Sequence, residues 1–290
     1  MPAPSPATIA APLPALATPP GRQPRVICVT SGKGGVGKTN VVANLAFVFA
    51  RQGKRVLVLD ADLSLANVDV LLGLAPRHNI QHVLAGDKTL AEIVTTGPGG
   101  MRILPAASGI LELSDLSDSQ KLYLLAEVEA LAEDVDILLI DTAAGINANV
   151  VYFILAAAER IVLVTPEPTS LTDAYALIKV LSSRHQVRRF QILVNHARSE
   201  QEAVGVFRKL GAVADRFLTT LSLDFLGFIP YDEHIPRAVR QQRLVAQLYP
   251  KAAASQSLRR LSEQILGNGP EPEADGNIKF FWKNLMHREP

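Results

Sequence analysis

A glycine-rich stretch near the N-terminal end constrains what this chain can fold into more than any other feature. Residues 32–39 read Gly-Lys-Gly-Gly-Val-Gly-Lys-Thr, directly after a short apolar run and directly before a segment with helical spacing. This order fits the pattern G-x-x-x-x-G-K-[ST], in which backbone N–H groups and a helix N-terminus cradle a phosphate. The sequence therefore predicts a strand, a phosphate-binding loop and a helix in succession.

The residue types in this loop have distinct expected roles. Glycines let the backbone turn inward, Lys38 is expected to reach the β- and γ-phosphates, and the Thr39 hydroxyl is expected to bind Mg²⁺. A second lysine, Lys33, lies early in the loop, although Lys38 already serves the phosphates of its own chain. The candidate nucleotide-binding residues are Gly32, Gly34, Gly35, Val36, Gly37, Lys38, Thr39 and Asn40.

Short apolar runs alternate with longer segments of helical spacing along most of the chain. The runs are rich in Val, Ile and Leu and span 26–30, 55–59, 136–140, 160–164, 190–194 and, more weakly, 226–229. Such runs are typical of parallel strands buried on both faces. Helical spacing is found at 38–52, 119–132, 169–183 and 199–217. The order predicts an α/β fold of the P-loop NTPase type, with a mostly parallel twisted sheet and helices on both faces.

Composition divides the chain into four parts. Residues 1–24 hold eight of the 19 prolines and a single charged side chain, so we expect a disordered arm there. Residues 25–266 form the predicted P-loop domain. Residues 267–276 are rich in Gly, Pro and acidic residues, which indicates a flexible linker before a last segment at 277–290.

Charge and cysteine content exclude several classes of protein. The chain has 29 basic and 28 acidic residues, so no overall basic field favours nucleic acid, and none is expected as a direct partner. A single cysteine excludes a disulfide framework, a zinc ribbon or an iron–sulfur cluster held by one chain, and it fits a reducing, cytoplasmic compartment. The longest apolar run, 150–158, is too short to cross a bilayer.

Acidic residues follow two of the predicted strands. Asp60 and Asp62 come directly after the run at 55–59, and Asp141 follows the run at 136–140. Ligands of open α/β sheets bind beyond the carboxyl ends of the strands, so these side chains are expected beside the loop. Phosphoryl transfer needs carboxylates that hold Mg²⁺ or its waters, and a group that orients the attacking water. The candidate metal ligands are Thr39, Asp60 and Asp141.

The loop with its early lysine resembles the deviant Walker A loop of the MinD/ParA ATPases. The resemblance covers roughly residues 25–266 and implies ATP hydrolysis to ADP and phosphate, with Mg²⁺ as a cofactor. In that family the early lysine crosses a dimer interface and touches the nucleotide of the other subunit. The resemblance therefore implies an ATP-dependent homodimer in which Lys33 acts in trans and Lys38 serves its own nucleotide.

Two later segments resemble the switch regions of the family. The first switch matches 60–67, which implies that Asp62 orients the attacking water and that Asn67 contacts the nucleotide. The second switch matches 141–145 and implies that Asp141 is an outer carboxylate of the magnesium site. Lys33, Lys38 and Asp62 are thus the predicted catalytic residues.

Further matches concern the dimer interface and the adenine. Residues 165–168 match a loop that meets the partner subunit, with Glu167 approaching the nucleotide there. Asn195, Pro230 and Asp232 match the positions that hold adenine, and an Asn amide presents a donor and an acceptor together. The order and spacing of these short matches behind the loop support the resemblance.

Several stretches are similar to the FlhG (FleN) branch of the family, the flagellar-number regulators. They are 38–41, with Asn40 where MinD usually has a second Thr, 141–146, 206–210, 224–233 and 238–243. The resemblance implies an ATP-dependent switch that controls the number and placement of flagella. It implies the signal-recognition-type GTPase FlhF, the flagellar master transcription activator and switch-complex proteins as partners.

The last segment, 277–290, has the pattern of a short amphipathic helix. The apolar face carries Ile278, Phe281, Trp282 and Leu285, and the opposite, basic side carries Lys279 and Lys283. Such a helix lies in the bilayer interface rather than spanning it, and binds weakly unless two copies act together. We therefore expect a cytoplasmic protein that becomes peripheral on the anionic inner face of the cell membrane when ATP joins two chains.

Three other interpretations remain open. A MinD-like division-site ATPase differs only by the FlhG-like stretches. A ParA-like DNA-binding protein would need a basic surface, which patches at 184–189 and 237–243 could supply. An ATP-bound adaptor with little catalytic activity would use hydrolysis only to reset itself. An iron–sulfur reductase or scaffold shares the loop but relies on cysteines that this chain lacks.

Overall fold

The computed structural model describes residues 24–62, 68–79, 82–83, 85–105, 123, 127, 130–131, 134–217 and 221–268. The predicted membrane-binding segment, with Ile278, Phe281, Trp282, Leu285, Lys279 and Lys283, lies outside the described residues, and so does Asn67 of the predicted first switch. The same holds for residues 1–23 of the predicted arm and for most of the predicted helix at 119–132.

Strands and helices alternate along the described chain, as the apolar runs predict. The strands are β1 (Arg25–Thr30), β2 (Val56–Ala61), β3 (Thr95–Thr96), β4 (Arg102–Leu104), β5 (Ile137–Thr142), β6 (Glu159–Val164), β7 (Arg189–Ala197) and β8 (Ser222–Pro230). The helices are α1 (Lys38–Arg51), α2 (Val68–Leu72), α4 (Leu90–Ile93), α6 (Ala148–Ala156), α7 (Pro168–His185), α8 (Glu200–Phe217), α9 (His234–Arg240), α10 (Val245–Leu248) and α11 (Ala253–Gly267), with a 3₁₀ turn, η1 (Pro98–Gly100).

The described strands form one eight-stranded sheet in the order β3-β4-β2-β5-β1-β6-β7-β8. Neighbouring strands run parallel except for β3 and β4 at one edge. The strand that leads into the glycine-rich loop, β1, therefore lies in the interior of the sheet between β5 and β6. The predicted mostly parallel α/β sheet is confirmed.

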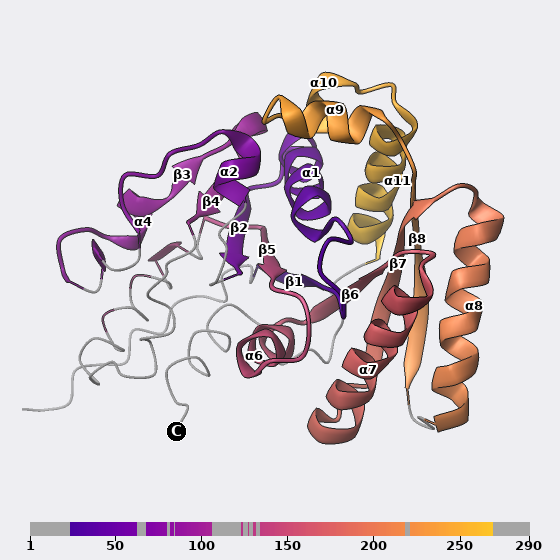
Figure 1. Ribbon diagram of the computed structural model, residues 1–290. Helices are drawn as coiled ribbons and strands as arrows, with labels where there is room; N and C mark the ends of the chain where they lie inside the picture. The colour runs from indigo at the N-terminus through magenta and orange to yellow at the C-terminus, as the bar shows by residue number, and fades with distance from the viewer. Residues whose placement is uncertain are drawn as a thin grey trace, which may run out of the picture.

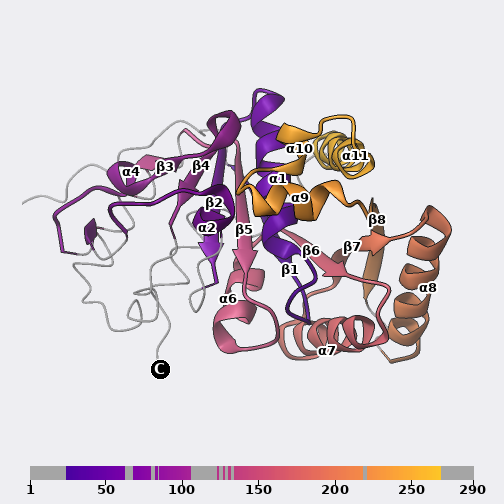
Figure 2. The ribbon, with the colours of Figure 1, turned by 45° about the horizontal axis from the view of Figure 1, so that its top comes forward.

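Two cores lie on opposite faces of this sheet, and β1 contributes to both. Val26 and Cys28 pack into one core and Ile27 and Val29 into the other, because successive side chains of a strand point to opposite faces. Figures 1 and 2 show α1 and α9 to α11 over one face and α6 to α8 over the other. A strand covered on both sides is apolar at almost every position, which explains the nearly unbroken run.

One predicted strand is longer in the structure, and one apolar run for which no element was predicted is partly helical. The last strand, β8, covers Ser222–Pro230 rather than only 226–229, because its outer residues are half-exposed and polar at the edge of the sheet. Part of the long apolar run at 150–158 belongs to α6, whose first turn is capped by Asn147 Oδ1 accepting from the Val150 N–H at 2.9 Å. Of the helices that the structure describes, none is long and apolar enough to cross a membrane.

Candidate nucleotide site

The loop at 31–37 joins the centre of the sheet to α1 and depends on glycine at two positions. A Cβ at Gly32 would lie 2.1 Å from the backbone carbonyl carbon of Asp173, so the loop can approach α7 only without a side chain there. Gly37, directly before α1, has a φ of 93°, in the left-handed region that favours glycine. The loop therefore curls over the N-terminus of α1, as phosphate binding requires.

Lys38 lies beneath this loop, where a phosphate would meet its charge. Its side chain is buried, and Nζ donates to Ser31 Oγ at 3.0 Å, while Ser31 Oγ donates to the carbonyl oxygen of Lys33 at 2.7 Å. Burial lowers the pKa of Lys38, and the carboxylates of Asp141 and Asp62 act in the opposite direction. A partly desolvated ammonium gains from a phosphate group, because charge-assisted hydrogen bonds are the strong ones.

Asp60 and Asp141 occupy matching positions on neighbouring strands. They are register partners in the parallel pair of β2 and β5, so both carboxylates lie at the same end of the sheet. Burial raises the pKa of Asp141 to about 7, with a further contribution from the Asp60 carboxylate. The Thr39 hydroxyl hydrogen-bonds to Asp141, whereas Asp141 Oδ1 is buried and has no hydrogen-bond partner among the described residues.

This arrangement fits a magnesium ion. A buried carboxylate oxygen without a donor, next to a threonine hydroxyl and a phosphate loop, offers the oxygen ligands that Mg²⁺ prefers together with phosphates and water. Within the described ranges there is no cluster of three or more His, Cys, Asp or Glu side chains that could hold a metal by itself. Thr39 and Asp141 are therefore the side chains best placed to hold the ion, which would supply charge neutralisation at the phosphates.

Asp60 also fixes both ends of the predicted first switch. Its Oδ1 accepts from the Asp62 N–H at 3.1 Å, and its Oδ2 accepts from the Val68 N–H at 3.2 Å. These bonds hold Asp62, which is half-buried, at the end of β2, where its carboxylate acts on Lys38. Asp60 thus positions the predicted water-orienting residue, in addition to its predicted role at the metal.

Lys33 contacts its own chain in this structure. Its Nζ donates to Glu167 Oε2 at 2.6 Å and to Thr169 Oγ1 at 3.0 Å, across the loop between β6 and α7. The hydrogen bond from Lys33 lowers the pKa of Glu167. The two residues predicted to meet at a dimer interface therefore lie side by side in one chain, and both side chains are exposed to solvent, by 36% and 61%.

A pocket of about 430 Å³ opens beside the loop and contains two of the three predicted adenine-binding positions, Asn195 and Asp232, whereas Pro230 does not line it. Gly37, Asn40, Asn195 and Asp232 all line it. Asn195 Nδ2 donates to the carbonyl oxygen of Val36 at 2.8 Å, and its Oδ1 is buried without a partner among the described residues. That free amide oxygen could accept a hydrogen bond from an exocyclic amino group such as that of adenine.

Asp232 has a further role in the wall of this pocket. One of its oxygens accepts from the His234 N–H at 2.9 Å and the other from the Ala254 N–H at 3.0 Å. Its carboxylate therefore fastens the loop after β8 to the first turn of α11. Pro230 ends β8 and pairs in register with Ala197, which brings the two predicted segments together.

His196 is a pocket residue that sequence reasoning missed. Its φ is 59°, a left-handed conformation that costs energy in a residue with a side chain, and it lies at a register shift between β7 and β8. Partial desolvation lowers the pKa of its exposed imidazole, although Glu167 acts in the opposite direction. No local pattern signals a left-handed residue inside a strand, so only its position next to Asn195 could have pointed to it.

The comparisons with known proteins agree with this geometry. Residues 22–266 match the ParA family model, described as a NUBPL iron-transfer P-loop NTPase. The antiactivator FleN of Pseudomonas aeruginosa is 46% identical over 90% of this chain and 93% of its own length. The flagellum site-determining protein YlxH of Helicobacter pylori is 33% identical over 90% of each chain. The structure of the septum site-determining protein MinD of Pyrococcus horikoshii, complexed with Mg-ADP, has a TM-score of 0.63 and 26% identity, covering 86% of this chain and 99% of that one.

The chain belongs to the ParA/MinD family of P-loop NTPases. It is an ATPase that uses ATP and Mg²⁺, and within the family it is a homologue of FleN and YlxH. The resemblance drawn from the loop and its early lysine is thereby confirmed. The roles of the individual site residues remain predictions, although the structure brings all of those that it describes to one end of the sheet.

Proposed function

We propose that this chain is an ATP-dependent dimerising switch with slow hydrolysis that regulates the number and placement of flagella. The observation that carries the proposal is its 46% identity with the antiactivator FleN over 90% of this chain. The identity with YlxH, a flagellum site-determining protein, supports the same process. The site supports the switching part, because a complete phosphate loop is combined with an exposed lysine that can change partners.

Dimerisation is supported by the environment of Lys33. Its ion pair with Glu167 lies at the surface, and a surface pair contributes little to stability and is easily exchanged. In a dimer, Lys33 would leave Glu167 and meet the phosphates of the other subunit, with Glu167 near that nucleotide. With ATP, wild-type protein is expected to elute as a dimer in size-exclusion chromatography and Lys33→Ala as a monomer. A stable Lys33→Ala dimer would contradict the role in trans.

Turnover is supported by the placement of Asp62, which lies at the end of β2 and acts on Lys38. Asp62→Ala is expected to keep ATP binding and dimerisation and to lose phosphate release. Asp87→Ala, which changes an exposed aspartate outside the site, serves as the matched control. Hydrolysis by Asp62→Ala near the wild-type rate would show that another group orients the water. Measured turnover compared with dimer lifetime also separates a catalytic switch from an ATP-bound adaptor.

The partners decide between a flagellar and a division function. A pull-down from cells would use ATP-loaded Asp62→Ala as the dimeric bait and Lys33→Ala as the monomeric control. Specific capture of FlhF, the flagellar transcription activator or switch proteins by the dimer supports the proposal. Capture of division inhibitors instead would favour a MinD-like role, and ATP-dependent, salt-sensitive binding of DNA would favour a ParA-like one.

Peripheral membrane association in the ATP state completes the proposal and rests on the sequence pattern of 277–290 alone. Co-sedimentation with anionic liposomes would be compared for the full chain with ATP, with ADP, and without residues 277–290. The full chain with ATP is expected to pellet most strongly, because two helices bind more tightly than one. Equal pelleting with and without the segment would overturn this part.

A further inference from the structure

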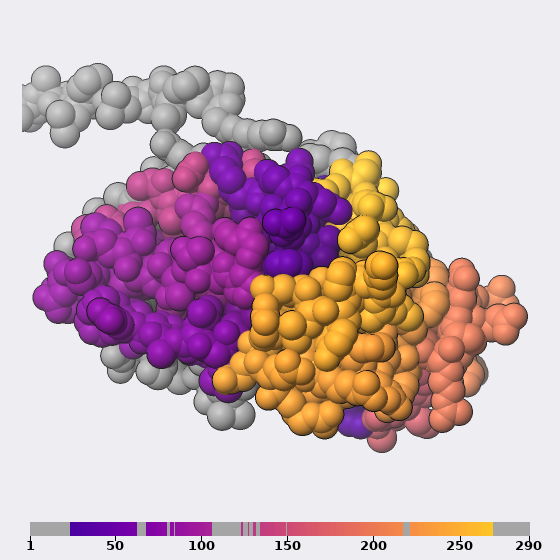
Figure 3. Space-filling view, turned by 90° about the horizontal axis from the view of Figure 1, so that it is seen from above, coloured from indigo at the N-terminus to yellow at the C-terminus, as the bar shows by residue number. Residues whose placement is uncertain are grey.

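A second hollow lies away from the nucleotide site, between α1, α10 and α11. It has a volume of about 650 Å³, within the range of roughly 300–1,000 Å³ that small-molecule sites occupy. None of its lining residues belongs to the phosphate loop or to the 430 Å³ pocket. In the view from above, the indigo surface of α1 lies against the yellow surface of α11 (Figure 3). This hollow is called the α1–α11 groove below.

The walls of the groove are fastened to each other by side chains. Gln52 Nε2, after the last turn of α1, donates to Ser262 Oγ on α11 at 2.9 Å, and Ser262 is fully buried. The N–H of Ala246, in α10, donates to Asn44 Oδ1 in the middle of α1 at 3.0 Å. Bonds on both sides keep the helices at a fixed separation, so the groove is a preformed cavity.

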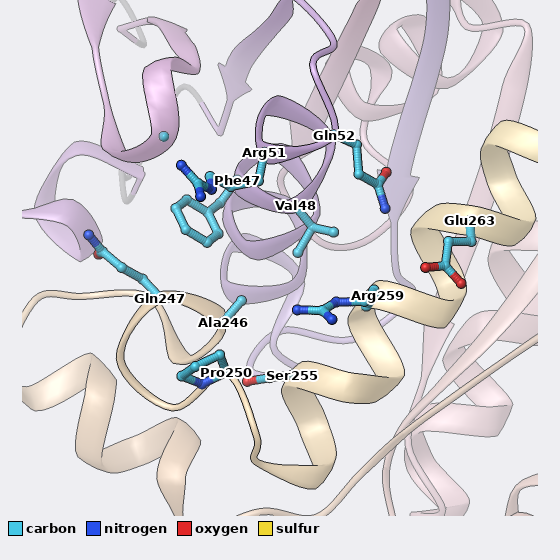
Figure 4. Close-up of a pocket in the computed structure, with 11 residues that line it drawn as sticks. Phe47, Val48, Arg51, Gln52, Ala246, Gln247, Pro250, Ser255, Arg259 and Glu263 are labelled. Atoms are coloured by element: carbon cyan, nitrogen blue, oxygen red, sulfur yellow. The ribbon is translucent and has the colours of Figure 1, made fainter.

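Cationic side chains dominate the charge of the groove. Arg51 and Arg259 line it, and neither guanidinium makes a hydrogen bond or ion pair with another residue in the part of the chain that the structure describes. Figure 4 shows Arg259 reaching from α11 toward Val48 and Ala246, into the hollow. Glu263 is the one acidic residue of the lining, which leaves a net positive charge. A guanidinium fork matches the geometry of a phosphate or carboxylate.

An apolar surface lies next to these cations. The ring of Phe47 faces the groove opposite Pro250, and Ala246 lies between them (Figure 4). Gly99 packs against this ring, because a Cβ at Gly99 would lie 2.9 Å from the Cδ2 atom of Phe47. The two residues together form an apolar part of the groove wall. Aromatic and aliphatic walls with a few convergent polar groups are typical of sites for small organic ligands.

We propose that the α1–α11 groove binds a small organic anion and acts as an effector site. The phosphate or carboxylate of the ligand meets Arg259, its ring or other apolar part lies against Phe47 and Pro250, and Arg51 adds positive charge at the rim. The site is assigned by two cations without partners among the described residues, an aromatic wall beside them and a cavity whose walls are joined by hydrogen bonds. It is separate from the ATP site and does not depend on dimerisation or turnover.

Hydrogen bonds connect the groove to the nucleotide pocket. Asn44, which holds Ala246 in the groove, also donates through Nδ2 to the carbonyl oxygen of Asn40 at 2.8 Å. Asn40 lines the 430 Å³ pocket beside the phosphate loop. A ligand in the groove therefore contacts Ala246, which is connected through Asn44 to Asn40 of the nucleotide pocket. By linkage, the groove ligand and ADP must change each other's affinity by the same factor.

The binding test uses the full chain saturated with Mg-ADP, so that the phosphate loop is already occupied. Phenyl phosphate and benzoate are titrated separately as probes, and ¹H–¹⁵N spectra report shifts at the amides of Gln52 and Ala246. Saturable shifts are expected with at least one probe, and the comparison of the two distinguishes a phosphate from a carboxylate ligand. Absence of saturable shifts with both probes overturns the proposed site.

Two variants locate the binding. Arg259→Gln is expected to weaken it at least about tenfold, which corresponds to about 1.4 kcal/mol. Arg260→Gln is the matched control, because Arg260 is the next residue of α11, is exposed and does not line the groove. Equal probe affinity in the two variants overturns the assignment of Arg259. Calorimetry of ADP binding with and without saturating probe tests the effector role, and an unchanged ADP affinity overturns it.

Discussion

Glu159→Gln is expected to destabilise this protein by about 3 kcal/mol, because it breaks a buried ion pair at the start of β1. Arg25 Nε and Nη2 donate to the two carboxylate oxygens of Glu159 at 2.7 and 2.8 Å, and the side chains are 12% and 5% exposed. Arg25 Nη1 also donates to the carbonyl oxygen of Ile265 at 2.7 Å. One guanidinium thus joins β1, which leads into the phosphate loop, to β6 and to the end of α11.

The magnitude follows from what the substitution leaves behind. Removing one partner of a buried pair costs about 3–5 kcal/mol, because the remaining charge stays buried without compensation. A glutamine at this position keeps one oxygen that can accept a bond from Arg25, so the lower end of that range applies. For a protein with a total stability of about 5–15 kcal/mol, this is a large fraction.

Urea unfolding of the nucleotide-free protein, followed by circular dichroism, measures the effect. The midpoint is expected to fall by about 1 M at an unchanged slope. The surface pair of Arg189 and Asp224, 53% and 41% exposed, is the matched control, and Asp224→Asn should cost about 0–1 kcal/mol. Replacing both buried partners, with Arg25→Met and Glu159→Leu, should cost less than the sum of the two single changes. A loss below about 1 kcal/mol for Glu159→Gln, or strict additivity, would refute the reasoning.

Three further predictions concern the nucleotide site. Gly32→Ala is expected to abolish Mg-ADP binding in calorimetry, because its Cβ would lie 2.1 Å from the Asp173 backbone. Gly205→Ala, in α8 and with nothing within 4 Å of the added Cβ, should still bind, and equal binding by both variants would contradict the packing argument. His196→Ala should weaken Mg-ADP binding about two- to tenfold, since stacking of one aromatic ring on another is worth about 0.5–1.5 kcal/mol. His185→Ala, outside the pocket, is the control, and equal affinity of the two variants would count against a role of His196 in binding. Without nucleotide or metal, the free energy of unfolding should decrease as pH rises from about 4 to about 7. The reason is that Asp141 has a pKa of about 7 in the folded protein and keeps its proton over this range, whereas in the unfolded chain it releases the proton near the ordinary aspartate pKa of about 3.9. Asp141→Asn should flatten this slope in urea unfolding at about pH 5 and about pH 7.5, and an identical slope in both proteins would show that another group is responsible.

The sequence by itself determined most strands of the sheet and the location of its loop. Buried parallel strands are apolar at almost every position, so β1, β2, β5, β6 and β7 can be recognised from short runs. The loop is equally local, because its glycines, Lys38 and Thr39 are consecutive. Asp60 and Asp141 follow from the rule that ligands bind at the carboxyl ends of parallel strands. These features depend on neighbours within a few residues, which a single sequence displays.

Only the tertiary structure decided which distant residues meet. Lys33 pairs with Glu167, 134 positions away, and Asn195 donates to Val36, 159 positions away. Both contacts depend on the order of strands in the sheet and on how closely Gly32 and Gly37 let the loop approach its neighbours. The left-handed His196 arises from a register shift between two strands, and the α1–α11 groove from the packing of helices far apart in the chain. Strand register and helix packing are set by the sum of many long-range contacts, so no local pattern of residues specifies them.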